Sequence, residues 1–413
     1  MKKADNPFLR FPQYTGDLVP LSLEELSASV TSGSRDWAQF YASSGAKFIR
    51  MTNLLRGTPN LDLSDLKYVN VPKDSRDGLR TRLETDDVLV SITAELGKVG
   101  LVPSDLGEAY INQHIALIKP KNTIIGCFLA NYLTAPQSQK RITRLNDSGA
   151  KAGLNLGTIK QFVVNLPDLR EQQKIADFLT AVDTKINQIT EKHRLLKEYK
   201  KGVMQQIFSQ QLRFKDKDGK AFPEWEEKHF GEVFGRVTQK NSVNNLNVLT
   251  ISAQKGLISQ LEYFNKSVSA KDVSGYYLLR KGDFAYNKSY SQGYPMGAIK
   301  PLKFYDSGVV STLYICFRPK KGFKEAYFEQ FFDAGMLNRE IAKIAQEGAR
   351  NHGLLNVSVK EFFDDIKLLV PHQNEQQKIA QFLQALDSKI AAVSQQIEQT
   401  KQFKKGLLQQ IFV

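Results

Sequence analysis

A turn-rich stretch, YNKSYSQGYP at residues 286–295, carries side chains that could hydrogen-bond to the edges of nucleic-acid bases. Amide, hydroxyl and ammonium groups are the donors and acceptors that read base edges in a DNA groove. Gly293 and Pro295 bound the turn. We predict groove contact by the polar residues of this stretch: Asn287, Lys288, Ser289, Tyr290, Ser291, Gln292 and Tyr294. An ordinary polar hairpin turn is the alternative.

Residues 82–100 parallel residues 278–297, with Asp87 opposite Asp283, so the first half of the chain should hold a counterpart of this turn. In the counterpart, SITAELGKVG, the candidate contacts are Ser91, Thr93 and Lys98. The paired segments SGAK and EGAR also place a basic residue after glycine and alanine, which could bring Lys151, Arg350 and the following Asn351 close to a phosphate. Plain turns would explain these segments equally well.

The overall charge fits a polyanionic partner. The chain has 413 residues, 57 Lys and Arg against 43 Asp and Glu, and a net charge of +14. Each cation placed near a phosphate releases a counterion and gains affinity, although a solvated basic surface is the alternative. No run approaches the roughly 20 apolar residues of a membrane span, and no signal peptide is apparent. We therefore expect a cytoplasmic protein without membrane contact.

Catalytic chemistry is not apparent in the sequence. There is no G-x(4)-G-K-[ST] phosphate loop for an ATP-driven motor, and no N-P-P-[FY] run for methylating adenine. The five histidines and two cysteines show no metal-ligand spacing. We predict no catalytic residue and no metal site, and expect the chain to bind rather than to react.

An internal repeat supplies the elements that must position the candidate turns. EQQKIADFLTAVDTKI (171–186) and EQQKIAQFLQALDSKI (375–390) are identical at 12 of 16 positions and are 204 residues apart. KGVMQQIF (201–208) and KGLLQQIF (405–412) repeat at the same shift. Between these anchors, apolar residues recur every three or four positions, which is the seam of a coiled coil. The sequence predicts two long helices that pack on each other; separate packing of each helix on its own domain is the alternative.

Each helix follows a segment in which strand-like and helical patterns are interspersed, so the predicted fold is mixed α/β (α+β) with a pseudo-twofold repeat. The predicted domains are an N-terminal arm (1–17), a first globule (18–166), a first long helix (167–210), an exposed linker (211–228), a second globule (229–370) and a second long helix (371–413). FP at Phe11–Pro12 and at Phe222–Pro223 is the expected match between the two entrances.

Two variable globules separated by helices that begin with EQQKIA and end with KGxxQQIF resemble the specificity subunits of type I restriction-modification systems, over nearly the whole chain. The resemblance implies that each globule is a target recognition domain for one half of a split DNA site. It also implies an antiparallel helix pair that acts as a spacer and docks two modification (methyltransferase) subunits, which the restriction (motor-nuclease) subunits join. S-adenosylmethionine, ATP and Mg²⁺ are then expected on the partner subunits only.

Two equal copies of EQQKIA would suit two equal partners, so the candidate docking residues are Gln172, Gln173, Lys174, Gln376, Gln377 and Lys378. The alternative is that these residues fasten each helix to its own globule. Two other functions stay open: a structural coiled-coil scaffold without sequence-specific DNA binding, and a nuclease whose carboxylates the sequence does not reveal.

Overall fold

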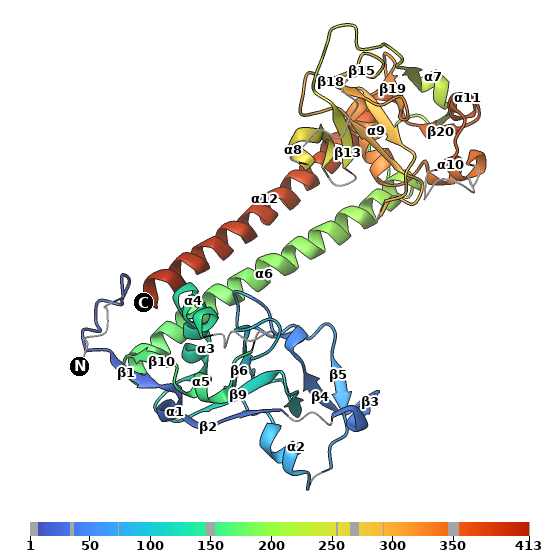
Figure 1. The fold of residues 1–413 in the computed structure, drawn as a ribbon. Coiled ribbons are helices and arrows are strands. Elements are labelled where there is room, and N and C mark those ends of the chain that lie inside the picture. Colours follow the sequence, from blue (N-terminus) through green and yellow to red (C-terminus); the bar gives the residue numbers. More distant parts are fainter. Residues whose placement is uncertain are drawn as a thin grey trace. The chain divides into compact units, whose positions relative to one another are not determined.

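The computed structural model describes residues 7–33, 37–72, 74–145, 153–252, 255–264, 272–291, 293–345 and 355–412. The chain divides into two compact units, Met1–Glu191 with Val393–Val413 (unit 1) and Lys192–Ala392 (unit 2). Each unit contains one globule and one end of each long helix (Figure 1). Globule 1 runs from β1 to β10 (residues 19–166), and globule 2 runs from β11 to β20 (residues 226–370).

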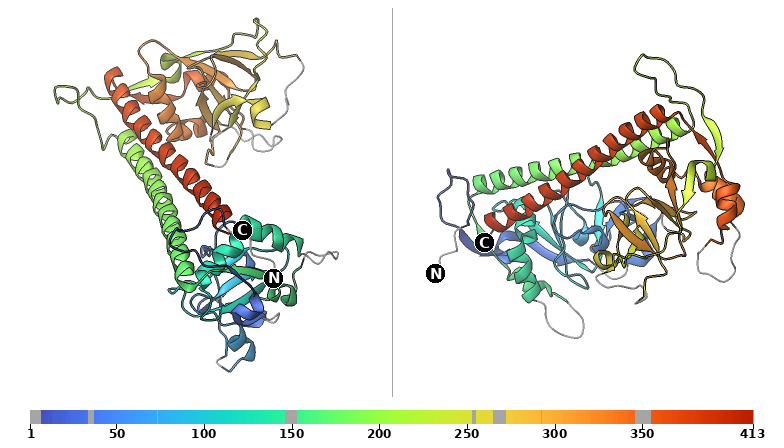
Figure 2. Two further views of the ribbon diagram at one scale, coloured as in Figure 1. Left: turned by 90° about the vertical axis from the view of Figure 1, so that its left-hand side faces the viewer. Right: turned by 90° about the horizontal axis from the view of Figure 1, so that it is seen from above.

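The two long helices are α6 (Leu169–Phe208) and α12 (Gln373–Ile411). In unit 1 the last part of α12 lies beside the first part of α6 and runs in the opposite direction (Figure 2). The apolar seam positions predicted on both helices are buried or half-buried. Two lysines on the seam are neutralised: Lys404 donates to both carboxylate oxygens of Asp183 at 2.6 and 2.7 Å, and Lys200 donates to Asp387 at 2.6 Å. The predicted antiparallel pairing is confirmed.

Both globules are built on the same four-stranded antiparallel sheet, which we call the frame. Its strand order is β2-β9-β6-β7 in globule 1 and β12-β19-β16-β17 in globule 2. The bounds are β2 (Ser27–Ser32), β6 (Val88–Ser91), β7 (Val99–Leu101) and β9 (Ile115–Pro120), and β12 (Phe234–Arg236), β16 (Phe284–Asn287), β17 (Ala298–Pro301) and β19 (Ile315–Pro319). The turn predicted at 286–295 therefore joins β16 to β17, and its counterpart joins β6 to β7.

Further elements repeat around the frame in the same order. In globule 1 these are β1 (Val19–Ser22), α1 (Leu23–Leu26), α3 (Gly126–Thr134), α4 (Pro136–Arg144), α5 (Leu156–Lys160) and β10 (Val163–Leu166). In globule 2 they are β11 (Glu226–His229), α7 (Phe230–Val233), α9 (Glu325–Asp333), α10 (Asn338–Ile344), α11 (Val359–Asp364) and β20 (Lys367–Val370). β1 pairs with β10 and β11 pairs with β20, so the last four residues assigned to the linker, 225–228, belong largely to globule 2.

A buried aspartate holds the start of the central strand in each frame. Asp87 accepts hydrogen bonds from the Glu84 N–H at 2.8 Å and from Lys119 at 3.0 Å. Asp283 accepts the Arg280 N–H at 2.7 Å and the guanidinium of Arg318. The predicted match of Asp87 with Asp283 is thus confirmed. Burial raises the pKa of the Asp87 carboxyl, despite its two donors.

The two globules differ in the segments inserted between frame strands. Globule 1 inserts a second four-stranded sheet of order β3-β5-β4-β8, with strands Tyr41–Ala42, Lys67–Val69, Ala46–Ile49 and Ala109–Ile111, and the helix α2 (Arg76–Thr81). Globule 2 inserts two strand pairs, β13 (Leu249–Ser252) with β14 (Gly256–Ser259) and β15 (Tyr277–Arg280) with β18 (Ser307–Val310), and the helix α8 (Gln260–Phe264). We call these insertions the outer layers.

An arginine clasp closes the start of each long helix. Arg10 donates from Nε and Nη2 to the buried Glu171 at 2.7 and 2.6 Å, and Arg213 donates in the same way to the buried Glu375 at 2.9 and 3.0 Å. Each clasp includes an aromatic contact with its helix, Phe11 with Phe178 at 5.9 Å and Phe214 with Phe382 at 5.7 Å between ring centroids.

The clasps correct two expectations about the entrances. Phe11 corresponds to Phe214, not to Phe222 as the FP match suggested. Each of the two residues ends a Leu-Arg-Phe triplet, and each ring contacts the equivalent phenylalanine of a long helix. The linker is also more than an exposed crossing, since Trp225 is buried and donates from Nε1 to Glu375 at 3.1 Å.

The chain ends pack together within unit 1. The Leu9 N–H donates to the Gln410 carbonyl at 3.0 Å, and the Phe412 ring contacts Phe128 and Tyr132 at 5.5 and 5.4 Å between centroids. The end of α12 is therefore part of the core of globule 1. Within the described ranges, no helix has the combination of length and apolar character that a bilayer crossing requires.

Candidate nucleic-acid interface and helix faces

The β16–β17 turn presents its side chains unequally. Tyr290 projects outward with 65% of its surface exposed, while Asn287, Lys288, Ser289 and Ser291 are half-buried. The Asn287 side chain accepts the Ser289 N–H at 3.1 Å, which holds the first part of the turn in shape. Tyr290 is thus the side chain of this turn best placed to reach a groove. Gln292 lies outside the described residues.

Tyr294 anchors the second part of the turn. Its hydroxyl accepts a hydrogen bond at 3.0 Å from Lys300, which is 6% exposed and ion-paired with Asp333 at 2.5 Å. Burial disfavours the Lys300 ammonium, but the charge and hydrogen bond of Asp333 outweigh it, so the pKa of Lys300 is raised. A fixed cation beneath the turn favours a positioning role for Tyr294.

The predicted DNA contact of Ser91 is wrong. Ser91 is fully buried, and its hydroxyl donates to the Glu95 carbonyl and accepts the Lys98 N–H at 2.8 Å, so it shapes the β6–β7 turn from inside. Thr93 is half-buried and shares a hydrogen bond with His114 Nδ1 at 2.7 Å. The Lys98 ammonium pairs with Glu95 at 2.8 Å. Thr93 and Lys98 thus have internal partners, and their DNA contacts remain predictions.

The remaining candidates for phosphate contact, Lys151, Arg350 and Asn351, lie outside the described residues. Another candidate is the loop of residues 55–63, which was not predicted from the sequence. Asn53 closes the base of this loop, since its side chain donates to the Asp62 carbonyl at 2.8 Å and its carbonyl accepts the Asp62 N–H at 2.8 Å. The tip is exposed and includes Arg56.

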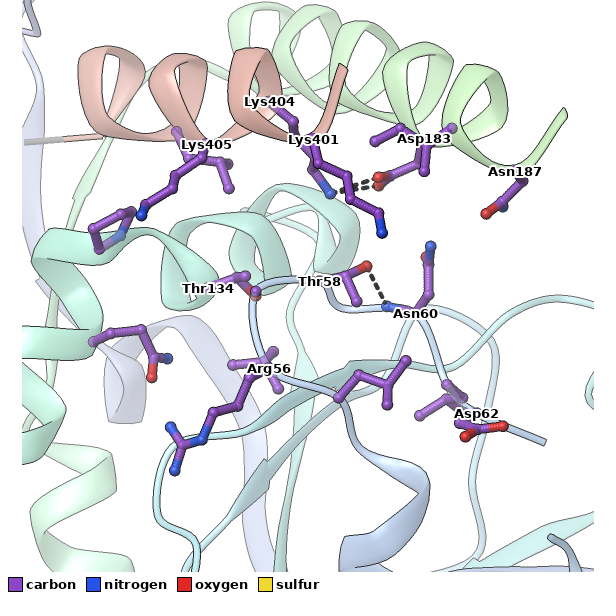
Figure 3. Close-up of a pocket in the computed structure, with 18 of the residues that line it drawn as sticks. Arg56, Thr58, Asn60, Asp62, Thr134, Asp183, Asn187, Lys401, Lys404 and Lys405 are labelled. Carbon is purple, nitrogen blue, oxygen red and sulfur yellow. Dashed lines mark hydrogen bonds and ion pairs between the residues drawn. The ribbon is translucent and has the colours of Figure 1, made fainter. Parts of the chain in front are cut away.

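This loop, the β6–β7 turn and the helix pair border one cavity of about 960 Å³ in unit 1 (Figure 3). Its floor includes Arg56, Thr58 and Asn60, and α12 contributes Lys401 and Lys405 on the opposite side. Lys404 also lines the cavity but is engaged by Asp183. Basic, hydroxyl and amide side chains around one hollow are the groups that contact phosphates and base edges. The mixture of Arg, Thr and Asn around Gly57 and Pro59 was the signal in the sequence.

Two of the six candidate docking residues do not fit a docking role. Gln172 and Gln376 are each 1% exposed. Gln172 accepts the Ile125 N–H at 3.0 Å and donates to the Pro167 carbonyl at 2.9 Å, and Gln376 does the same with the Lys324 N–H and the Pro371 carbonyl, both at 2.9 Å. They fasten each helix to its own globule, which was the alternative interpretation.

The other four candidates for docking lie nearer the surface, and no contact in the structure tests their role. Gln173 and Gln377 are exposed. The Lys174 ammonium lies 5.8 Å from the centre of the Phe11 ring, and the half-buried Lys378 donates to the Lys215 carbonyl at 2.6 Å. Both lysines thus also take part in the clasps.

A second repeated surface lies farther along the helices. Tyr199 and Phe403 are 54% and 56% exposed and are 204 residues apart. Gly202 and Gly406 follow one turn later, and a β-carbon added to either glycine would meet nothing within 4 Å. Glycine inside a helix costs about 1 kcal/mol relative to alanine. Packing inside the described part of the chain does not require glycine at these two positions. Close approach of another molecule to the helix would explain why glycine is present.

The comparisons with known proteins agree with this architecture. Residues 75–197 and 223–402 match the family described as the type I restriction modification DNA specificity domain. These segments cover well over half of the chain, which therefore belongs to this family. Specificity subunits are the non-catalytic DNA-recognition subunits of type I restriction-modification systems, in agreement with the function expected from the sequence.

One relative from Methanocaldococcus jannaschii, described as the MjaX type I restriction enzyme specificity subunit, is 25% identical over 373 residues, covering 84% of this chain and 82% of the relative. The crystal structure of a type I restriction-modification S subunit from M. genitalium covers 99% of both chains with a TM-score of 0.58 at 14% identity. A chain from a structure on complex assembly and conformational transition of the type I system covers 98% of this chain and 97% of its own length, with a TM-score of 0.53 at 16% identity. At these identities the solved structures support the fold.

Proposed function

We propose that each globule reads one half of a bipartite, asymmetric site in double-stranded DNA. The observation that carries this proposal is the repeated frame with two different outer layers. Bases are read by side chains that enter a groove, so different loops on one frame would read different half-sites. A protein with internal twofold repetition suits two half-sites separated by about one or two turns of duplex, ~34 Å each.

The paired helices would then set the number of unread base pairs between the half-sites. A long helix rises about 1.5 Å per residue, so one heptad added to both helices would lengthen the gap by about 10 Å. This length corresponds to about three base pairs at ~3.4 Å each. The seam pairs Lys200–Asp387 and Lys404–Asp183 support a fixed register, because a slip would leave a lysine without its carboxylate.

The partners in this proposal are two modification subunits, one for each helix repeat, which the motor-nuclease subunits join in the cytoplasm. S-adenosylmethionine, ATP and Mg²⁺ would bind those partners. Gln173, Lys174, Gln377 and Lys378 remain candidate contacts at the helix starts. Tyr199 with Gly202, and Phe403 with Gly406, form two further candidate faces, because an exposed aromatic residue beside a glycine would allow a partner helix to approach closely.

Mapping N6-methyladenine across the genome tests the proposal. Cells would carry this chain with a cognate modification subunit, and matched cells would lack only this chain. We expect a split motif of two short, different halves that disappears with the chain. A motif that persists without the chain, or no motif despite an active partner, would contradict DNA reading and favour a scaffold role.

A further inference from the structure

The helix pair carries a repeated lysine face that nothing inside the described chain explains. Residues 187–200 and 391–404, the diverged middle of the helix repeat, agree at two positions, Lys197 with Lys401 and Lys200 with Lys404. Lys200 and Lys404 are accounted for by their seam carboxylates. Lys197 and Lys401 do not lie on the seam.

A second repeated lysine lies one turn beyond each of them, Lys201 and Lys405. Residues four apart lie on the same side of a helix, so each long helix presents one exposed lysine pair. Lys197, Lys201 and Lys405 have no side-chain hydrogen bond or ion pair to any described residue. Lys401 has an ion pair with Glu398 at 3.4 Å, but both side chains are exposed, and solvent screening leaves such a pair weak. The equivalent of Glu398 in α6 is Arg194, so the lysine is repeated and its acidic neighbour is not.

Both lysine pairs occupy the same place relative to their globules. Lys401 and Lys405 come directly before Leu407, Leu408, Ile411 and Phe412, which are buried in the core of globule 1. Lys197 and Lys201 come directly before Val203, Met204, Ile207 and Phe208, which are buried in the core of globule 2. Each pair thus lies on its helix between the globule and the middle of the spacer.

In unit 1 the pair also faces the candidate interface. Lys401 and Lys405 line the same cavity as Arg56 and Asn60 of the 55–63 loop (Figure 3). A DNA strand that meets this loop would run next to α12. Two lysines four residues apart are separated by about 6 Å along the helix axis. A phosphate and the next but one on the same DNA strand are separated by about 7 Å along the duplex, so the two spacings match.

We propose that Lys197, Lys201, Lys401 and Lys405 bind phosphates of the unread DNA between the two half-sites. The spacer would then hold the gap electrostatically as well as measure it. This inference rests on the proposed reading of a bipartite site. Lysine acts here as a point charge on the backbone, so it adds affinity without changing the sequence that is read.

The first test measures the salt dependence of binding by the complex with modification subunits. Each lost phosphate contact should reduce the slope of log affinity against log salt by about 0.9. When salt is raised from 50 to 200 mM, the fold loss of affinity should therefore be about ten times smaller for the double variant Lys197→Gln/Lys201→Gln than for the parent. Lys401→Gln/Lys405→Gln should behave in the same way, with an unchanged recognition sequence. Lys217→Gln/Lys220→Gln, in the exposed linker turn, is the matched control and should keep the parental slope.

The second test uses DNA with uncharged methylphosphonate linkages in the gap only. The parent should bind this DNA more weakly than unmodified DNA. The variant lacking all four lysines should bind the two DNAs with nearly equal affinity. An unchanged salt slope, an equal loss in parent and variant, or a variant that releases modification subunits would overturn the inference. Failure of the parent to prefer any split sequence would instead contradict the proposed function.

Discussion

In globule 1 the segments between frame strands form a second four-stranded sheet, whereas in globule 2 the corresponding segments form two separate strand pairs. The frame keeps its strand order in both globules but is filled with different side chains. Val88 faces Ile118 across the first frame, and Phe284 faces Phe317 at the same register in the second, with ring centroids 5.5 Å apart. Aliphatic and aromatic cores support one topology.

This comparison indicates where the two globules can differ without losing their attachment to the helices. The frame, the clasp and the start of the long helix are repeated in both units. Asp87 matches Asp283 in the frame, and Glu171 matches Glu375 in the clasp. The outer layers and the turns between frame strands are not. Differences in recognition should therefore reside in the outer layers and turns, and stability should depend mainly on the repeated parts.

The largest expected effect is loss of a clasp. Glu375→Gln should destabilise unit 2 by about 3 kcal/mol, because Arg213 and the buried Trp225 both lose their carboxylate partner. Glu171→Gln should destabilise unit 1 by about 2 kcal/mol, since Arg10 is the only side chain found donating to Glu171 among the described residues.

The two tryptophans allow each unit to be followed separately in urea. Trp37 lies in globule 1 and Trp225 in the second clasp, so Trp37→Phe leaves a reporter for unit 2 and Trp225→Phe leaves one for unit 1. Each glutamate variant is compared with its own single-tryptophan parent. Equal losses in the two units would mean that Trp225 adds nothing to its clasp.

The parts of the fold that could be predicted are those whose sequence pattern lies within a single helix or strand. The seam could be predicted because apolar spacing is a property of one helix, and Asp87 matched Asp283 because the strands around them repeat. The match of Arg10 with Arg213 was missed because only the triplet Leu-Arg-Phe repeats at the entrances, and a nearby FP suggested another alignment. Ser91 and Gln172 were misassigned because a polar side chain has the same letter whether it binds DNA or satisfies a buried backbone group.

The two seam pairs should contribute unequally to stability, and neither should exceed the effect of losing a clasp. Lys404 is 5% exposed, so Asp183→Asn leaves a buried ammonium without a countercharge and should destabilise unit 1 by about 2 kcal/mol. The Asp387 side chain is 45% exposed, so Asp387→Asn should destabilise unit 2 by less than about 1 kcal/mol.

The same single-tryptophan chains measure both changes. The exchange Asp183→Lys/Lys404→Asp restores a pair of opposite charges and should recover part of the lost stability. A double exchange no more stable than Asp183→Asn would show that the contribution of this pair depends on its orientation.

Changes in the recognition turns should affect binding and not folding. Tyr290→Ala, in the β16–β17 turn, should weaken discrimination in one half-site by about 1–3 kcal/mol and leave the other unchanged. Arg56→Ala, in the 55–63 loop, should affect the opposite half-site or its flanking phosphates. Selection of bound sequences from a randomised DNA pool measures both halves at once. A variant that relaxes both halves would break the assignment of one half-site to each globule.

The smallest effect on stability is expected at the repeated aromatic faces of the helices. Tyr199 and Phe403 are more than half exposed, so Tyr199→Ala and Phe403→Ala should each change the free energy of unfolding by less than about 0.5 kcal/mol. Because the two faces are equivalent, each single variant should weaken one of two bound modification subunits, and the double variant should weaken both. Native mass spectrometry of the assembled complex counts the subunits directly. Full occupancy in the double variant would exclude these faces and leave Gln173, Lys174, Gln377 and Lys378 at the helix starts as the candidate docking contacts.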